Sequence, residues 1–261
     1  MRSFLVLLLG SAVFLGFGAS LDVPFDLGRP AREWALFGVD LAMPGIPTNP
    51  GSLAFSSGWS LSSTFSSVFG ALQVWAISGG GRGIAGEVIL LDSGEIGPNL
   101  RYRVWAGTVE AGFQLGSFGI GTRVRYLHPE QPKSSSGWAL DLGVLWAGPV
   151  YVGVLAESIL SSPPSEEVWS CDFSLAAVFP WTLGNFSGSF GAGVLDVLSF
   201  PTGSLAMEVD FGALSLRGSL RPSNLCLGGG VELQWFGLDW TFTVHPDLPL
   251  SFRVSFVLRW P

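Results

Sequence analysis

The chain has 261 residues, of which 48% are hydrophobic and only 13% are charged, and its formal net charge is −7 at pH 7. This composition argues against a disordered chain and a collagen-like fibre, and the acidic balance argues against nucleic acid as a partner. Beyond residue 20 there is no run of 18 apolar residues, which excludes a helical membrane protein. An apolar chain whose apolar residues alternate with polar ones instead predicts an all-β fold, a transmembrane antiparallel β-barrel.

Residues 1–20 contain, in sequence, the three regions of a secretory signal peptide. Arg2 gives a positive start, residues 4–17 form an apolar run, and Gly18-Ala19-Ser20 offers small residues for cleavage. An uncleaved anchor is the alternative, but the run is shorter than the roughly 20 residues that a spanning helix needs. We expect the mature chain to begin near Leu21.

Residues 21–50 do not have the pattern of a strand. Five prolines interrupt regular strand pairing: Pro24, Pro30, Pro44, Pro47 and Pro50. The apolar side chains between them, Leu36 and Phe37 among them, need burial. A ring of about fourteen strands encloses more space than its own side chains fill. We therefore predict a hatch or plug inside the barrel over residues 21–50, with a periplasmic leader packed under the barrel as the alternative.

Residues 51–261 alternate with the period of β-strands. In residues 251–260 the apolar side chains of Phe252, Val254 and Phe256 share one face, while Arg253 and Ser255 lie on the other. The same alternation predicts fourteen strands, near residues 58–65, 69–78, 84–91, 100–114, 118–127, 137–146, 150–158, 171–180, 185–194, 204–211, 213–220, 225–234, 237–244 and 250–260. Alternation alone also fits a soluble β-sandwich.

Three features favour the membrane barrel over the sandwich. The polar faces carry glycine, serine and sparse charges of both signs rather than lysine. Long connections alternate with tight turns, as in barrels with short periplasmic turns and longer external loops. Tryptophans stand at the ends of predicted strands, as an interfacial girdle requires: Trp59, Trp138, Trp146, Trp181, Trp235 and Trp260. We expect a protein of the outer membrane of a Gram-negative-type bacterium, surrounded by the lipid bilayer.

Twelve charged residues fall on faces predicted to point into the barrel. They are Glu87, Arg101, Arg103, Glu110, Arg123, Arg125, Asp141, Glu208, Asp210, Arg217, Glu232 and Arg253. An arginine facing lipid at the midplane would cost roughly 2–4 kcal/mol, so inward placement is preferred. The charges either pair with one another and fill the lumen, which is the favoured interpretation, or fix the plug and line a polar route.

The sequence indicates no enzyme, and we predict no catalytic residue, no cofactor and no metal site. Its two histidines, His128 and His245, each precede a proline in a predicted external loop, where a turn is the usual role. Residues 79–83 (GGGRG) join two strands and are interpreted as a periplasmic turn rather than a phosphate loop. Cys171 and Cys226 could form a disulfide in an exported protein, although two free thiols are the favoured reading.

Two stretches resemble a known family. Residues 35–42 (ALFGVDLA) followed by residues 49–54 (NPGSLA) resemble the "ALGGA…NPAGLA" segment of FadL-like outer-membrane proteins, in particular their PorV/PorQ-type branch. Residues 119–127 (GIGTRVRYL) and 138–146 (WALDLGVLW) are similar to the fifth and sixth strands of that branch. After about residue 160 the likeness is only compositional. Gly51-Ser52 replaces Ala-Gly of the family pattern, and the short loops argue against a large external substrate cap.

The resemblance implies a fourteen-stranded barrel with an amino-terminal hatch and two alternative functions. As a transporter, the protein would bind a hydrophobic or amphipathic small molecule beside the hatch, near Leu36, Phe37, Asn49 and Pro50, and release it through a gap in the wall. As an accessory or scaffold barrel, it would dock secreted or periplasmic proteins. The transporter is narrowly preferred, and inward-facing Leu127, Leu145 and Val257 are modest support for it.

Overall fold

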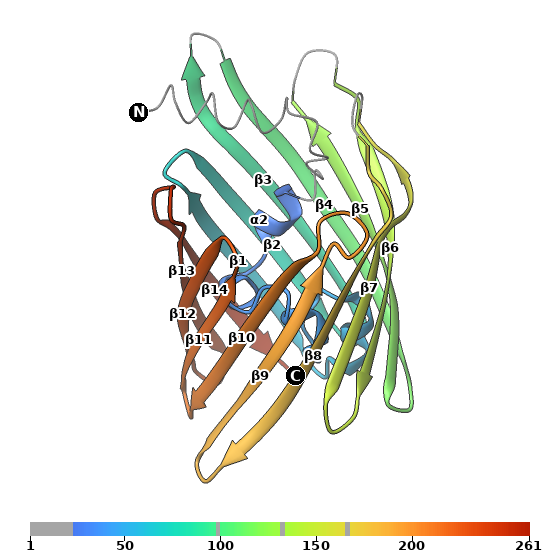
Figure 1. Cartoon of the computed structure of the whole chain (residues 1–261), viewed down its shortest axis with the longest axis vertical. Coiled ribbons are helices and arrows are strands. Elements are labelled where there is room, and N and C mark those ends of the chain that lie inside the picture. Colours follow the sequence, from blue (N-terminus) through green and yellow to red (C-terminus); the bar gives the residue numbers. More distant parts are fainter. Residues whose placement is uncertain (1–22, 98–99, 131–133, 165–167) are drawn as a thin grey trace.

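The computed structural model describes residues 23–97, 100–130, 134–164 and 168–261, so the predicted signal peptide lies outside the described residues. Fourteen antiparallel strands close into a barrel in which each strand pairs with its sequence neighbours and β14 pairs with β1 (Figure 1). Their bounds are β1 Trp59–Val68, β2 Leu72–Gly81, β3 Ile84–Gly97, β4 Leu100–Leu115, β5 Phe118–Pro129, β6 Gly137–Ala147, β7 Tyr151–Ser162, β8 Asp172–Leu183, β9 Phe186–Leu195, β10 Thr202–Phe211, β11 Leu214–Arg221, β12 Asn224–Glu232, β13 Phe236–Val244 and β14 Ser251–Trp260. The predicted all-β fold and strand count are confirmed.

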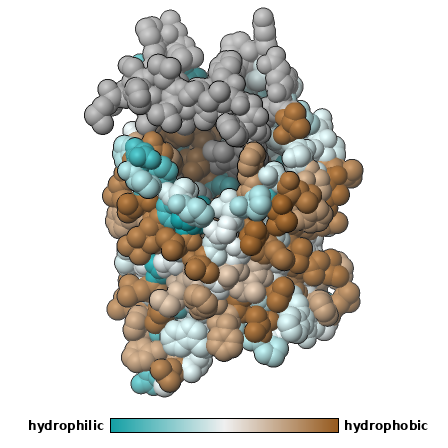
Figure 2. All heavy atoms as spheres, in the orientation of Figure 1, coloured by the Kyte–Doolittle hydropathy of each residue, from teal (hydrophilic) through white to brown (hydrophobic). Residues whose placement is uncertain are grey.

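The alternation of the sequence becomes an apolar outside and a mostly polar inside. In β14, Phe256 is 53% exposed, whereas the preceding Ser255 is fully buried. Apolar side chains cover much of the outer wall (Figure 2). The tight-turn end of the barrel, where β1 begins and β14 ends, carries five of the predicted girdle tryptophans: Trp59, Trp146, Trp181, Trp235 and Trp260. Trp138 stands at the opposite, loop end, so the apolar wall is bounded at both ends as a bilayer requires.

Three local predictions are corrected. The turn between β2 and β3 consists of Arg82 and Gly83 alone, and both have positive φ (51° and 86°), as a two-residue hairpin turn of the primed type demands. Gly79–Gly81 therefore belong to β2. Strand β3 continues to Gly97 because its pairing with β4 persists through two register shifts after Asp92. His128 lies within β5 rather than in a loop.

Residues 23–55, the inner segment, lie inside the barrel (Figure 1). They form two short α-helices, α2 (Val23–Gly28) and α3 (Ala31–Ala35), and two 3-10 helices, η1 (Asp40–Ala42) and η2 (Pro50–Phe55). Prolines that would disrupt a strand instead start helices: Pro30 caps α3 and Pro50 opens η2. Among the described residues, no helix is both long and apolar enough to span a membrane.

The inner segment meets the wall through two apolar clusters. One joins α2 to the wall around β1–β5 through Phe25, Leu27, Val68, Val74, Ala76, Ile89, Leu91, Val104, Ala106 and Leu127. The other joins the η1 region to β6–β10 through Leu36, Val39, Leu41, Ala42, Met43, Ile46, Leu145, Leu155, Ala176, Val178 and Ala206. Because α3 packs on β11–β14, the segment touches the wall on every side.

Candidate functional site

Asn49 ties the inner segment to the wall. Its Nδ2 donates to the carbonyls of Leu41 (2.9 Å) and Val144 (3.0 Å), while its Oδ1 accepts from the backbone N–H of Gly51 (3.0 Å). The side chain is fully buried, so these bonds form away from bulk water. Leu36 and Pro50, also predicted for the hatch, are buried beside it in the same segment, and Phe37 lies under a stacked Arg221 guanidinium.

Glycines of the wall make room for η2. A Cβ built on Gly121 or Gly143 would lie under 3.0 Å from atoms of Pro50, closer than real Cβ contacts. Gly112 and Gly119 are equally close to the backbone of η2. The wall of β4–β6 is therefore flat where the 3-10 helix rests, and only glycine permits so close an approach.

Replacing Asn49 with alanine is expected to lower the free energy of unfolding by about 1–3 kcal/mol, because it leaves buried backbone groups without their partner. Urea titration of the protein in lipid, followed by circular dichroism, measures the change. The matched control is Gln114→Ala, since the exposed Gln114 bonds only to the nearby Gly116 carbonyl. Equal stability of the two variants would show that Asn49 does not anchor the segment.

Asp141 is the centre of the first group of lumen charges. Its Oδ2 accepts from Arg123 Nε at 2.7 Å, and its Oδ1 accepts from Arg125 Nη2 at 2.9 Å and from the Ser158 N–H at 2.8 Å. Arg123 also donates to Glu157 Oε1 (3.0 Å). All of these side chains lie on the lumen side of β5, β6 and β7, where the buried carboxylate and guanidinium groups compensate one another.

A second group centres on Glu208. It accepts from Arg32 of α3 (3.0 Å) and from Arg217 Nε (2.5 Å), and Arg217 also pairs with Asp239. Arg253 donates to the Arg29 carbonyl and stacks over Trp34, with the guanidinium carbon 4.2 Å from the ring centroid. The second group joins the wall to the inner segment through Arg32, and the first group does so through the hydrogen bond from Arg123 to the Thr48 carbonyl.

Two of the predicted lumen arginines are on the outside. Arg101 and Arg103 alternate with buried Val104 and Ala106, so they share the outer face of β4 with the exposed Trp105. At the loop end they pair with Asp92, and Arg103 also pairs with Glu130, beyond the apolar wall. The free-energy cost of an arginine that faces lipid is small at the rim of the barrel. The argument that charged side chains must point inward therefore does not hold for Arg101 and Arg103.

Two of the predicted lumen carboxylates lie near the tight-turn end. Glu232 pairs there with Arg259 at 2.9 Å and is largely exposed. Asp210 faces the lumen two residues after Glu208, opposite Ser215 of β11.

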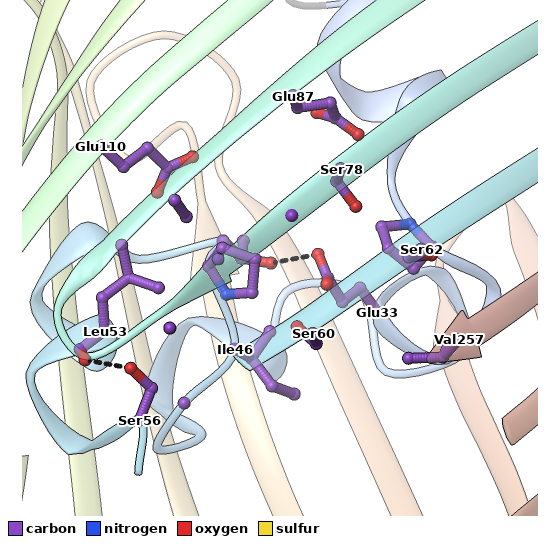
Figure 3. Close-up of a pocket in the computed structure, with 18 of the residues that line it drawn as sticks. Glu33, Ile46, Leu53, Ser56, Ser60, Ser62, Ser78, Glu87, Glu110 and Val257 are labelled. Carbon is purple, nitrogen blue, oxygen red and sulfur yellow. Dashed lines mark hydrogen bonds between the residues drawn. The ribbon is translucent and has the colours of Figure 1, made fainter. Parts of the chain in front are cut away.

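A cavity of about 610 Å³ separates the inner segment from the wall of β1–β4 and β14. It extends to the tight-turn end, where Trp59, Trp235 and Trp260 line it. Figure 3 shows three carboxylates, Glu33, Glu87 and Glu110, together with Ser56, three serines of the wall strands β1 and β2, and the apolar Ile46, Leu53 and Val257. The wall serines are Ser60, Ser62 and Ser78.

Glu87 and Glu110 were predicted to lie in the lumen, whereas Glu33 was not. Glu33 comes from α3 and accepts a hydrogen bond from Thr48 Oγ1 at 3.1 Å. The available signal was a lone carboxylate in an otherwise apolar stretch (REWALFG), which has to be buried together with its neighbours. Helix α3 brings it to the two wall carboxylates, a convergence that no local pattern encodes.

Within the described ranges, no three His, Cys, Asp or Glu side chains are grouped so that they could hold a metal ion. Cys171 is exposed and Cys226 is buried, and both are free thiols. Cys226 Sγ lies 3.4 Å from Thr243 Oγ1, which itself accepts from Trp34 Nε1 at 2.8 Å. The thiol is therefore covered by the inner segment.

No protein-family model matches the chain, and no curated protein matches it. Among solved structures, the outer membrane protein Omp33 of Acinetobacter baumannii is similar, with a TM-score of 0.52, 10% sequence identity, and coverage of 79% of this chain and 100% of that one. A triple mutant of the Rhodopseudomonas blastica porin covers 78% of this chain and 98% of its own, with a TM-score of 0.44 and 8% identity. The fold is that of a bacterial outer-membrane β-barrel, and the apolar outer wall requires a lipid bilayer.

Proposed function

We propose that this barrel is a channel-like transporter that admits hydrophobic or amphipathic small molecules through the outer membrane, with the inner segment as its plug. The observation that carries the proposal is the cavity of about 610 Å³ beside the inner segment. Its volume falls within the roughly 300–1,000 Å³ of small-molecule sites, and its lining combines apolar and polar groups as such sites do.

Passage through the barrel requires the inner segment to move. A second, smaller cavity of about 180 Å³ lies on the loop side, lined by Leu27, Trp34 and Phe69, and Trp34 belongs to the segment between the two cavities. Of the three inward-facing residues that gave modest support for a transporter, Leu127 and Leu145 pack against the inner segment. Of the three, Val257 lines the cavity.

The alternative, a PorV/PorQ-like barrel that docks secreted or periplasmic proteins, is favoured by how fully the lumen is filled. Two apolar clusters, the Arg32–Glu208 ion pair and the hydrogen bond from Arg123 to the Thr48 carbonyl hold the inner segment in place. A barrel that only docks other proteins never has to open, so its lumen can be filled in this way without leaving a path for a solute. The two functions differ in whether the segment moves.

Entry of a hydrophobic fluorescent probe into cells that display the full chain tests the transporter. We expect faster entry than in cells with an empty vector, because the outer leaflet otherwise slows such compounds. Entry at the vector rate, together with a periplasmic or secreted protein that co-purifies in stoichiometric amount, would favour the docking function.

Cys226 reports on movement of the plug. In a Cys171→Ser background, a membrane-impermeant maleimide is expected to label Cys226 at least ten-fold faster while the probe is being taken up, because displacing Trp34 uncovers the thiol. Mass spectrometry of the intact protein measures the labelled fraction, and a Cys226→Ser variant gives the background. An unchanged labelling rate during active uptake would contradict a moving plug.

A further inference from the structure

The wall of the large cavity carries a continuous row of cross-strand neighbours. Val257 of β14 is opposite Ser62, Ser62 is opposite Ser78, and Ser78 is opposite Glu87. Glu110 of β4 is a diagonal neighbour of Glu87, because Glu87 is opposite Thr108. Diagonal neighbours are roughly 7–8 Å apart, within reach of long side chains. The row places two carboxylates and two hydroxyls on one lumen surface, and Glu33 faces them from α3 (Figure 3).

Among the residues that the structure describes, no arginine forms an ion pair with these three glutamates, although arginines line the same cavity. Arg123 is opposite Glu110, yet its three guanidinium nitrogens donate to Asp141, to the Thr48 carbonyl and to Glu157. The other cavity arginines pair elsewhere: Arg29 with Asp26 and Asp40, Arg32 with Glu208, Arg125 with Asp141, and Arg259 with Glu232. The arginines of the cavity are therefore engaged with other groups, and in the described part of the chain the three glutamate carboxyl groups are left without a salt-bridge partner.

Several buried polar atoms at this surface have no hydrogen-bond partner. Ser62 is 7% exposed and its hydroxyl is unpartnered, and Glu110 is 6% exposed with an unpartnered Oε2. Glu87 Oε1 is unpartnered as well. Unpaired buried polar groups are rare in folded proteins, because the free energy lost when they leave water is not recovered in a new hydrogen bond. Ser62, Glu87 and Glu110 line one cavity, and their unpaired oxygens fit a ligand that donates hydrogen bonds.

The kind of donor follows from the spacing and from the rest of the lining. In the described part of the chain no group of His, Cys, Asp or Glu side chains could hold a metal ion, so we consider an organic cation instead. Ile46, Leu53 and Val257 offer apolar surface in the same cavity. We propose that the cavity binds an alkylamine, with its ammonium group among Glu33, Glu87 and Glu110 and its hydrocarbon chain on these three apolar side chains.

This inference rests on the proposed transport function, since it names the class of amphipathic molecule admitted. The two can fail separately. Amine binding without probe uptake would contradict transport alone, whereas probe uptake without amine binding would contradict the amine site alone.

Calorimetric titration of the purified full-length protein with hexylamine, 1-hexanol and hexanoate tests the site. The three probes share one hydrocarbon chain and differ in charge, so we expect hexylamine to bind at least ten-fold more tightly than hexanol and hexanoate to bind least. Equal affinities for hexylamine and hexanol would overturn the proposal. This comparison uses the unmodified protein and does not depend on any variant.

Isosteric variants locate the site. Glu87→Gln and Glu110→Gln, singly and together, are expected to weaken hexylamine binding while leaving hexanol binding unchanged, with a loss of at least ten-fold in the double variant. Glu130→Gln is the matched control, because Glu130 lies on the outer rim beside Arg103. Hexylamine affinity that is the same in the double variant and in the control would place the amine elsewhere and overturn the assignment.

Discussion

Deleting residues 23–48 is expected to turn a closed barrel into an open one. The deletion removes α2, α3 and η1 but keeps Asn49 and η2, which rest on the glycines of β4–β6. The wall keeps its complete ring of antiparallel pairs, because β14 pairs with β1 independently of the inner segment. In planar bilayers we expect stable single-channel conductance from the deletion variant and none from the full chain.

A single substitution tests whether conductance arises from displacement of the inner segment or from misfolding of the barrel wall. Gly143→Val introduces a side chain against Asn49 and Pro50, and overpacking of this kind costs about 1–3 kcal/mol, so it should loosen η2 and give intermittent openings. Gly218→Val is its control, since a Cβ at this wall position meets only ordinary contacts of 3.4 Å or more. A deletion variant that retains barrel circular dichroism yet never conducts would contradict the plug.

Much of the wall could be predicted because strand alternation is a local property. Ser251–Trp260 alone shows which side chains meet lipid, and the structure agrees in exposing Phe256 and burying Arg253. Boundaries were less secure where pairing rather than composition decides them. The glycines of residues 79–81 resemble a turn, but β1 and β3 hold them in the sheet.

The site could not be predicted in the same way because it depends on register and on the fold of the inner segment. Arg103 and Glu110 differ by an odd number of positions, so they cannot share a face of one regular strand, and only the folded barrel shows that Glu110 points inward and Arg103 outward. Convergence of Glu33 with Glu87 and Glu110 needs α3 to be placed against the wall. A resemblance in residues 49–54 pointed to Asn49, but not to the carbonyls that it binds.

The second large effect is expected from Asp141→Ala. Asp141 is fully buried and its carboxylate is shared by Arg123 and Arg125, both also buried. Removing one member of a buried ionic group leaves charge without compensation, which typically costs about 3–5 kcal/mol. Urea unfolding in lipid should therefore show a loss of that size, well above the effect of Asn49→Ala.

Asp92→Ala provides the comparison, since Asp92 also binds two arginines, but on the outer rim where Arg101 is half exposed. Water screens such pairs, and we expect a loss of about 1 kcal/mol or less. Replacing Arg123, Arg125 and Asp141 together by Met, Met and Leu should recover much of the stability that Asp141→Ala loses, because both buried guanidinium groups are removed with the carboxylate, and Glu157, the other partner of Arg123, is in part exposed to water. If the triple variant is as unstable as Asp141→Ala, the loss arises from the packing of Asp141 against Ser158 in β7 rather than from uncompensated charge.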